Sequence, residues 1–424
     1  MIESFFWRKV LARTGLARYV PSLKRVLDGA EAYLPYYSDR MLAAPLGALQ
    51  DAALLPTIRT PDSIDLALGS PRCDLHLSLP RAYHDRRPES AWGDSELREE
   101  LAARFHRDHG PNPDPAEEVL VTHGATGAFA AALDAFINPG DRVVLFDPTS
   151  PLFALGLSHR RAAIVQVPTW SEKGSVRFAM DVFAKAMRGA KMLVLADPAN
   201  PTGGVFAAED LEQIAFWARK TDAIIFQDAS FDHWRAEPAR ARLAALPHAE
   251  GRTLTCGSFA KSHGLSAIRV GWLTGHRHLV RPCALAVTLS APFVSPLCQQ
   301  VALTALRSGD ETLASARKDM NDRREYVGER LRAMGLSPWP AAAGYFFWIP
   351  VPAGDTGRSF AQRLLSETGV LVNPGEPFSP TGSRFIRLSF ATDEGRLRTG
   401  LNRLAEFLVG ENHVPSRELC VVSE

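Results

Sequence analysis

Lys261 could act as an amine nucleophile, because its neighbours in the sequence are small or apolar. It ends the segment Gly-Ser-Phe-Ala-Lys at 257–261. A lysine that is partly desolvated loses its proton more easily, and the neutral amine is the reactive form. Eight residues further along, Arg269 offers a rigid guanidinium fork that suits an anion. Together the two residues predict amine chemistry beside an anion-binding group.

Two more charged residues lie in apolar stretches, where a charge needs a partner. Asp228 ends a short apolar strand predicted at 223–227, and Arg387 lies inside the apolar stretch 385–390. Arg387 should therefore meet an anionic ligand or a partner acid. Asp228 needs a partner if it is buried, and the alternative is a simple helix N-cap.

Two loops carry small residues that would let the backbone approach a ligand closely. The sequence Thr-His-Gly-Ala-Thr-Gly-Ala at 122–128 follows a predicted strand and opens a helix, so its free N–H groups could face an anion. The sequence Asp-Pro-Ala-Asn-Pro-Thr-Gly-Gly at 197–204 follows another strand, and the amide of Asn200 could donate a hydrogen bond there. Each loop alone is also compatible with an ordinary tight turn.

The elements that must position these residues alternate between strands and helices from about 95 to 275. We expect helices at 96–106, 126–137 and 208–220, and strands at 119–121, 142–146, 162–167, 192–196, 223–227, 253–257 and 270–274. Apolar strands interleaved with helices imply a mostly parallel sheet that is covered on both faces. In such folds, ligands bind at the carboxyl ends of the strands.

The pattern changes after about residue 310, where a smaller α+β unit is expected. It would contain helices at 311–334, 358–368 and 393–409 and strands at 345–349 and 384–390. We therefore predict an N-terminal arm at 1–60, a large domain at 61–312 whose early part also packs with the small domain, a small C-terminal domain at 313–412 and a flexible tail at 413–424.

The composition is that of a soluble globular chain and excludes several other classes. The 424 residues contain 48 Lys and Arg against 47 Asp and Glu, a net charge of +1, so we expect no nucleic-acid partner. With 46% hydrophobic and 22% charged residues, disorder is excluded as the main state. The five cysteines are widely spaced and form no C-x-x-C pair, so we expect a reducing, cytoplasmic location rather than a disulfide framework or a zinc site.

Neither a membrane span nor a metal site is expected. The stretch between Arg281 and Arg307 has no charge, but its prolines and polar residues favour a loop followed by a buried helix. The basic segment 1–30 could be an arm that packs on the body or on a second subunit, or a membrane-surface helix. His106 and His109 lie three residues apart at a helix end, where a solvated face is favoured over a metal pair.

Taken together, these segments resemble the aspartate-aminotransferase-like (class I/II) aminotransferases, which are pyridoxal-phosphate-dependent enzymes of fold type I. The resemblance covers about residues 65 to 410. It is strongest in Asn-Pro-Thr-Gly at 200–203, Ser-x-x-Lys at 258–261, Arg-Val-Gly-Trp at 269–272 and Arg387, with the family's early and late glycine loops at 68–71 and 373–378. It implies an α/β fold with a mostly parallel seven-stranded sheet in a large domain and a smaller α+β domain.

The resemblance also implies roles around the cofactor ring. Lys261 would form the Schiff base with pyridoxal phosphate and then carry the proton between the substrate Cα and the cofactor C4′. Asp228 would pair with the pyridinium nitrogen, so that the ring can act as an electron sink. Asn200 would donate to the ring oxygen O3′, and Phe231 would lie beside the same oxygen.

At the two ends of the site, the resemblance implies anion binding. Arg387 would clamp the substrate α-carboxylate in a bidentate pair, next to Gly69. The cofactor phosphate would be held by Ser258, Arg269 and the backbone N–H groups of Ala125 and Thr126, with help from the helix dipole.

Four positions depart from the family pattern. Phe231 replaces a tyrosine that gives O3′ a second hydrogen bond, a loss of about 1.5–3 kcal/mol at most. Ser150 stands where an aromatic residue usually stacks on the ring, a loss of about 0.5–1.5 kcal/mol unless Phe153 or another ring replaces it. Pro88 stands near the position of a partner-subunit tyrosine, and Ala260 replaces a serine.

These observations favour an aminotransferase that moves an amino group between an L-amino acid and a 2-oxo acid, acting as a homodimer with each active site at the subunit interface. The departures at Phe231 and Ser150 keep a second interpretation open, namely another pyridoxal phosphate reaction by a lyase, decarboxylase, cyclase or oxidase. A third interpretation is a non-catalytic protein of the same fold that serves as a binding partner or regulator.

Overall fold

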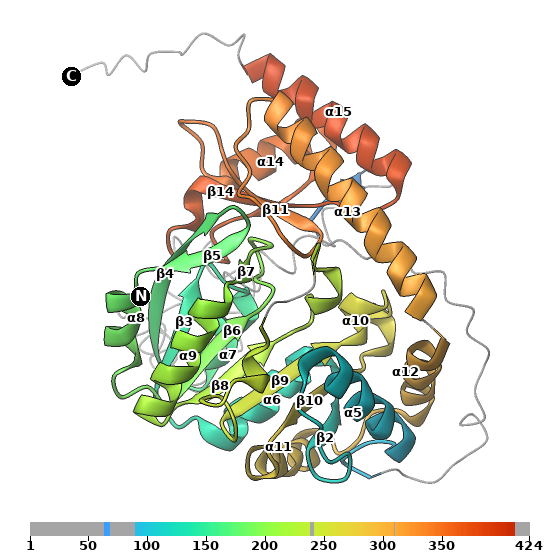
Figure 1. Ribbon diagram of the computed structural model, residues 1–424. Helices are drawn as coiled ribbons and strands as arrows, with labels where there is room; N and C mark the ends of the chain where they lie inside the picture. The colour runs from blue at the N-terminus through green and yellow to red at the C-terminus, as the bar shows by residue number, and fades with distance from the viewer. Residues whose placement is uncertain (1–62, 68–89, 238–240, 309, 412–424) are drawn as a thin grey trace, which may run out of the picture.

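The computed structural model describes residues 63–67, 90–237, 241–308 and 310–411. Figure 1 shows a large sheet with its helices in the lower part and the C-terminal elements above it. The predictions for the N-terminal arm, for the C-terminal tail and for Gly69 and Pro88 lie outside the described residues.

The described residues build a nine-stranded sheet in the order β2-β10-β9-β8-β6-β3-β4-β5-β7. Its strands are β2 (Val119–Thr122), β3 (Arg142–Asp147), β4 (Ala163–Glu172), β5 (Ser175–Phe178), β6 (Met192–Ala196), β7 (Val205–Phe206), β8 (Ile224–Asp228), β9 (Thr253–Ser258) and β10 (Gly271–Gly275). The seven strands expected from the sequence occupy the first seven positions, and the short β5 and β7 extend one edge. Strands β4, β3, β6, β8 and β9 are parallel, whereas β10 is antiparallel to both of its neighbours.

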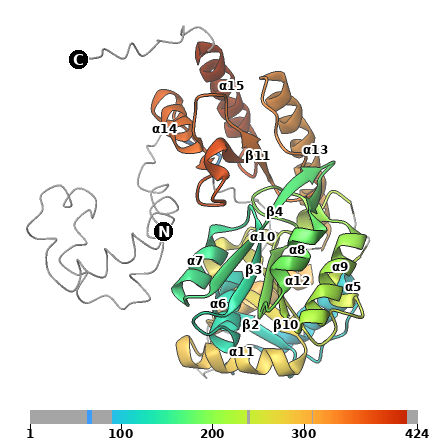
Figure 2. The ribbon, with the colours of Figure 1, turned by 90° about the vertical axis from the view of Figure 1, so that its left-hand side faces the viewer.

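Helices cover both faces of this sheet, as the apolar strands require. All five residues of β6 are buried. On one face, α6 (Gly124–Phe136) and α11 (Arg277–Ser290) share a core with the strands, and on the other face α8 (Met180–Met187) and α9 (Ala208–Thr221) do the same (Figure 2). The parallel strands are thus shielded from water on both sides.

The helix ends follow local capping rules. Asp94 caps α5 (Ser95–His109), because its carboxylate accepts a hydrogen bond from Leu97 N at 2.9 Å. At the other end of a helix, Asp222 terminates α9 in the left-handed conformation, with φ 55°. These ends place the helix axes against the strands that they cover.

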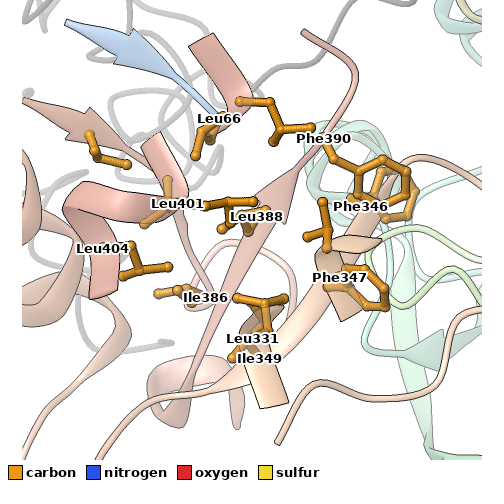
Figure 3. Close-up of a cluster of buried hydrophobic side chains, with 14 of the residues drawn as sticks. Leu66, Leu331, Phe346, Phe347, Ile349, Ile386, Leu388, Phe390, Leu401 and Leu404 are labelled. Atoms are coloured by element: carbon orange, nitrogen blue, oxygen red, sulfur yellow. The ribbon is translucent and has the colours of Figure 1, made fainter. Parts of the chain in front are cut away.

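The C-terminal part forms a second layer around a three-stranded antiparallel sheet in the order β11-β14-β13. Its apolar core includes Leu331, Phe347, Ile386 and Leu401 (Figure 3). The elements are α13 (Asp310–Ala333), β11 (Phe346–Pro350), α14 (Gly357–Thr368), β12 (Val370–Leu371), β13 (Asn373–Pro374), β14 (Phe385–Ser389) and α15 (Glu394–Glu411).

An early strand of the chain pairs with this C-terminal layer. Strand β1 (Ile64–Asp65) runs parallel to β12, and Leu66 lies in the same apolar core (Figure 3). This pairing brings the start of the described chain next to residues more than 300 positions later. The predicted domain boundary at residue 312 stays a prediction.

The sequence did not predict helices α7 (Pro151–His159), α8 and the short α10 (Phe259–Ser262), and it misjudged part of a further region. The charge-free stretch after Arg281 first continues α11 through Pro282, which was not expected, and then gives the predicted loop and the predicted helix as α12 (Pro296–Ser308). None of the helices in the described ranges is long and apolar enough to cross a membrane.

Candidate active site

A cavity of about 450 Å³ collects the predicted site residues between the carboxyl ends of the parallel strands and the C-terminal layer. The nine predicted residues within the described ranges all line it: Ala125, Thr126, Asn200, Asp228, Phe231, Ser258, Lys261, Arg269 and Arg387. The tenth, Gly69, lies outside those ranges. The same ranges hold no group of three acidic, histidine or cysteine side chains that could bind a metal ion.

The first turn of α6 forms one end of the cavity with backbone donors. Ala125 and Thr126 line the cavity, and His123 at the N-cap makes no side-chain hydrogen bond to the helix. The turn contains no acidic residue. Its N–H groups and the positive end of the helix dipole therefore remain available to an anion.

Arg269 and Ser258 complete this anion-binding end. A Cβ added to Gly124 would lie 2.8 Å from Arg269 Nη2 and 3.9 Å from Ser258 Oγ, so both polar groups lie close to that glycine. The backbone of Arg269 has φ 54°, a left-handed conformation that residues with side chains rarely adopt. Its Nη1 donates to Ser266 O at 3.1 Å. A strained backbone thus turns a guanidinium into the cavity, as is common at functional sites.

Lys261 lies in the short helix α10 (Phe259–Ser262), directly after β9. Ser258 starts this helix, and its Oγ accepts a hydrogen bond from Ala260 N at 3.2 Å. Trp234 Nε1 donates to Lys261 O at 2.8 Å. The backbone of the lysine is therefore held from both sides.

The surroundings of Lys261 favour its neutral form. Burial and the nearby charges of Arg387 and Arg269 lower the pKa of the Lys261 amine to about 8, although Asp228 opposes this change. A lysine with this pKa is neutral in about one molecule in ten at pH 7, far more often than an ordinary lysine. The prediction of an activated amine agrees with this environment.

Asp228 is the last residue of β8 and lines the wall of the cavity. Its Oδ1 accepts a hydrogen bond from Ser230 N at 2.9 Å. Burial raises the pKa of the Asp228 carboxyl above its usual value, and the hydrogen bonds from Ser230 and the charge of Lys261 only partly oppose this. A cationic N–H group brought against Asp228 would restore the charged carboxylate. The residue is therefore not a simple helix N-cap.

Arg387 joins the C-terminal layer to the loop after β6. Its Nη1 donates to Asn200 Oδ1 at 2.8 Å, and its Nη2 donates to Ala67 O at 3.0 Å. The rings of Phe346 and Phe378 lie 5.3 and 4.7 Å from its Cζ. Burial lowers the pKa of Arg387 to about 10, so it remains charged at neutral pH, and its buried Nε has no partner among the described residues. The charge of Asp65 stabilises the cationic form of Arg387, and the unpartnered Nε leaves room for an anionic ligand.

A buried ion-pair network fixes the loops that follow β6 and β8. Arg235 donates from Nη2 to Asp197 Oδ2 at 2.8 Å and from Nε to Asp232 Oδ1 at 2.6 Å. The positive charges of Arg235 and its neighbours outweigh burial and lower the pKa of Asp232 to about 2. The network therefore ties together the two loops that carry Asn200 and Phe231.

The structure also describes three of the four departures from the family pattern. Ser150 lines the cavity, but Phe153 is buried in the core against Phe129, with ring centroids 5.0 Å apart, so Phe153 does not replace the missing stack. The cavity wall next to Ser150 is instead aliphatic, with Leu152 and Leu155. Phe231 and Ala260 both line the cavity.

Sequence reasoning missed several residues that form the other wall. Tyr345 and Phe346 line the cavity where β11 begins, and Phe378 lines it from the loop after β13. Tyr345 and Phe346 belong to an apolar run that predicted only a strand, so nothing marked them as residues of the cavity wall. Phe378 belongs to the segment 373–378, which was noted only as a glycine loop of the resembling family.

Comparison with known proteins gives one consistent family. The family described as aminotransferase class I and II matches residues 90–404. The Bacillus subtilis protein YugH, which is named as an aminotransferase, is 31% identical over 314 residues, covering 74% of this chain and 81% of the relative. The aspartate aminotransferase of Pyrococcus abyssi is 29% identical over 318 residues, covering 74% and 82%.

Solved structures agree with these sequence relatives. An aspartate aminotransferase from Thermus thermophilus with maleate superposes with a TM-score of 0.78 at 28% identity, covering 87% of this chain and 99% of that one. An N-succinyldiaminopimelate aminotransferase from Mycobacterium tuberculosis gives a TM-score of 0.77 at 26% identity, covering 85% and 96%. The shared feature of these names is transfer of an amino group, and their substrates differ.

Proposed function

This chain belongs to the class I and II aminotransferases, and on that premise we propose how its own residues carry out pyridoxal-phosphate-dependent transfer of an amino group between an amino acid and a 2-oxo acid. When it is bound, pyridoxal phosphate supplies an aldehyde for the amino group and an aromatic ring that takes up the charge developing at the substrate Cα. The residues of the cavity fit this molecule at three places.

The fit begins at the anion-binding end. The open first turn of α6, Ser258 Oγ and the guanidinium of Arg269 converge on Gly124, which has no side chain to fill the space. This cradle suits a phosphate. At the wall, the buried carboxyl of Asp228 suits a ring N–H, and Lys261 offers an amine that interacts electrostatically with both Asp228 and Arg269.

Lys261 and Asp228 then have separate tasks. Lys261 Nζ would be the amine that holds the cofactor through its aldehyde carbon. Once free, the same amine would accept the proton from the substrate Cα and deliver it to C4′ of the cofactor. Asp228 keeps the ring nitrogen protonated. The observation that carries this proposal is that Lys261 and Asp228 line one cavity together with the anion-binding groups.

Arg387 holds the substrate, and Asn200 helps to position Arg387. The guanidinium of Arg387 is fixed by Asn200 Oδ1 and Ala67 O, and its unpartnered Nε is free to take one oxygen of a carboxylate. The Asn200 amide nitrogen is left to donate to the cofactor ring oxygen. The role of Gly69 in substrate binding stays a prediction.

The remaining wall of the cavity suits an apolar substrate side chain. Among the described residues that line it, the cations are Lys261, Arg269 and Arg387, and each already has a task. The apolar lining comes from Leu152, Leu155, Phe346, Pro374, Pro377 and Phe378. A second carboxylate on the substrate would find no further cation there, and burying it unpaired would be costly. We therefore propose amino acids with uncharged, apolar side chains as the amino donors.

The test is a half-reaction followed by absorbance. The purified protein, loaded with pyridoxal phosphate, is mixed with single amino acids without any 2-oxo acid. Conversion of the visible band to that of pyridoxamine phosphate is expected with leucine or phenylalanine, with kcat/KM at least about tenfold above that for aspartate or glutamate. Faster conversion by aspartate would overturn the substrate class alone, whereas no conversion by any amino acid would overturn the proposed roles of Lys261 and Asp228.

A homodimer is proposed from an exposed apolar face at the end of α11. Leu285, Leu289 and Phe293 are 61%, 81% and 42% exposed, and the two leucines lie four residues apart on one side of the helix. Such a group of apolar residues is characteristic of an interface, and a second copy of the chain is the occupant that the family favours. Leu289→Glu should produce monomers in sedimentation, whereas Val409→Glu, at a 62% exposed position on α15, should not. A monomeric unsubstituted protein would contradict this proposal.

A further inference from the structure

Phe231 brings no hydrogen-bond donor to its part of the cavity wall. It lines the cavity with Lys261 and Asp228 and is 6% exposed, but its ring carries no polar group. The corresponding position in the resembling family holds a tyrosine. A phenolic donor near Phe231 would therefore remove the main objection to transamination that the sequence raises.

Tyr345 is the nearest phenol to Phe231 in the described residues. The two rings pack edge to face with centroids 5.4 Å apart, although the residues come from different layers of the protein. Phe231 follows β8 in the large sheet, whereas Tyr345 directly precedes β11 in the C-terminal layer. The contact therefore places the phenol beside the ring that lacks a hydroxyl.

The hydroxyl of Tyr345 has no hydrogen-bond partner among the described residues, although the side chain is only 1% exposed. A buried tyrosine normally uses its hydroxyl, because leaving it unpaired in an apolar environment is costly. Tyr345 lines the cavity. A bound molecule in the cavity would supply the missing partner.

Three neighbours hold Tyr345 in place. Its ring packs edge to face against Phe231, Trp234 and Phe346, with centroid distances of 5.4, 6.1 and 5.7 Å. Burial raises the pKa of the Tyr345 phenol far above its usual value, although the charge of Arg387 opposes this. The phenol therefore keeps its proton throughout the working pH range and can act as a donor.

We propose that Tyr345 supplies the hydrogen bond that Phe231 lacks, with its phenol donating to the ring oxygen of bound pyridoxal phosphate. This inference rests on the proposed function, because it requires the cofactor to lie in this cavity. Asn200 and Tyr345 then form the donor pair for that oxygen, one from the loop after β6 and one from the start of β11. In this proposal the phenolic donor comes from the start of β11 in the C-terminal layer, whereas the family's tyrosine would stand at position 231, after β8.

The test is a pH titration of the visible band of the bound cofactor, without substrate, in Tyr345→Phe, Phe231→Tyr and the double variant. A donor to the ring oxygen stabilises its negative charge and so lowers the apparent pKa of the cofactor linked to Lys261. Tyr345→Phe should raise this pKa by about one unit, a tenfold change in the proton equilibrium. In the presence of Tyr345, Phe231→Tyr should lower this pKa only slightly. In the Tyr345→Phe background, Phe231→Tyr should bring the pKa back to about the value of the unsubstituted protein.

Tyr326→Phe is the matched control. The Tyr326 hydroxyl lies 3.5 Å from Arg398 on the surface of α13 and α15, so this variant should leave the titration unchanged.

An unchanged pKa in Tyr345→Phe, or no return of the pKa in the double variant, would overturn the proposal. A loss of carboxylate affinity without a change in this pKa would also overturn it, because the phenol would then face the substrate. If Tyr345→Phe does not fold, a large effect of Phe231→Tyr alone overturns the proposal and a small one supports it. Failure of the proposed function would be seen separately, because the unsubstituted protein would show no visible band.

Discussion

Arg387 Nη1 donates a hydrogen bond to Asn200 Oδ1 at 2.8 Å, across a separation of 187 residues in the chain. This bond joins the C-terminal layer to a loop at the carboxyl end of the parallel sheet. The proposed substrate-binding group and the proposed cofactor-binding group are therefore positioned by each other. A carboxylate that binds Arg387 would therefore also affect the position of Asn200, the proposed donor to the cofactor ring.

Replacing Arg387 should weaken substrate binding without removing the cofactor. In Arg387→Lys the amine cannot make a bidentate pair, and a lost charged hydrogen bond is worth about 1.5–3 kcal/mol. We expect kcat/KM to fall by about ten- to a hundredfold, mainly through KM, while the visible band of the bound cofactor persists. Arg384→Lys is the control, because Arg384 contacts only backbone carbonyls near Asp355 and Pro352. Loss of the band in Arg387→Lys would contradict the assigned role.

The pH dependence of cofactor loading should report the lowered pKa of Lys261. Only the neutral amine reacts, so the rate of loading of the cofactor-free protein should rise with pH and reach half of its maximum at about pH 8. An ordinary lysine would instead give a midpoint above pH 10. The Asp228 carboxylate favours the charged form of the Lys261 amine, so Asp228→Asn should move the midpoint to lower pH. A midpoint near that of free lysine would show that the cavity does not activate this amine.

Gly124 should tolerate no side chain next to the phosphate site. Both Gly124→Ala and Gly140→Ala place a side chain at a positive φ, of +70° and +90°, and each should cost about 1 kcal/mol or more in unfolding free energy. Only the Cβ at Gly124 meets Arg269, at 2.8 Å, whereas nothing lies within 4 Å of one at Gly140. Titration with pyridoxal phosphate should therefore show weaker binding in Gly124→Ala alone. Equal affinities in the two variants would argue against the phosphate cradle.

An aromatic residue at Ser150 should tighten cofactor binding. Ser150 lines the cavity and makes no side-chain cap to α7, so its replacement loses no hydrogen bond there. In Ser150→Phe a ring stack would add about 0.5–1.5 kcal/mol, which corresponds to roughly a two- to tenfold lower dissociation constant for pyridoxal phosphate. Activity towards bulky amino acids should fall, because the ring takes their space. A dissociation constant that does not decrease would mean that position 150 does not face the cofactor ring.

Local patterns in the sequence were sufficient for seven of the nine strands of the sheet and for the charged residues that line the cavity. Met192–Ala196 is an uninterrupted apolar strand, and it ends at the loop that carries Asn200, so strand and site residue could be predicted together. Lys261 and Arg269 were identifiable for a similar reason, because a charge in an apolar neighbourhood is unusual. These signals depend only on neighbours in the chain.

Contacts between distant segments could not be predicted in this way. Tyr345 reads as an ordinary strand residue, and its contact with Phe231 exists only after two layers have packed. Helix α7 was missed because Pro151 and Gly156 suggest a loop, although proline is well tolerated in the first turn of a helix. Pro282 likewise lies inside α11 without ending that helix, whereas the helix expected after the loop does begin at Pro296, as α12. Tertiary packing decided these cases.

The central claim is that Lys261 is the residue that holds the cofactor, and peptide mass analysis tests it most directly. The protein is loaded with pyridoxal phosphate, treated with borohydride to make the link permanent, digested and analysed by mass spectrometry. The account predicts a phosphopyridoxyl group on the peptide that contains Lys261, absent from a parallel sample of Lys261→Ala. An unmodified Lys261 peptide, or a modification that survives in Lys261→Ala at another lysine, would contradict the account.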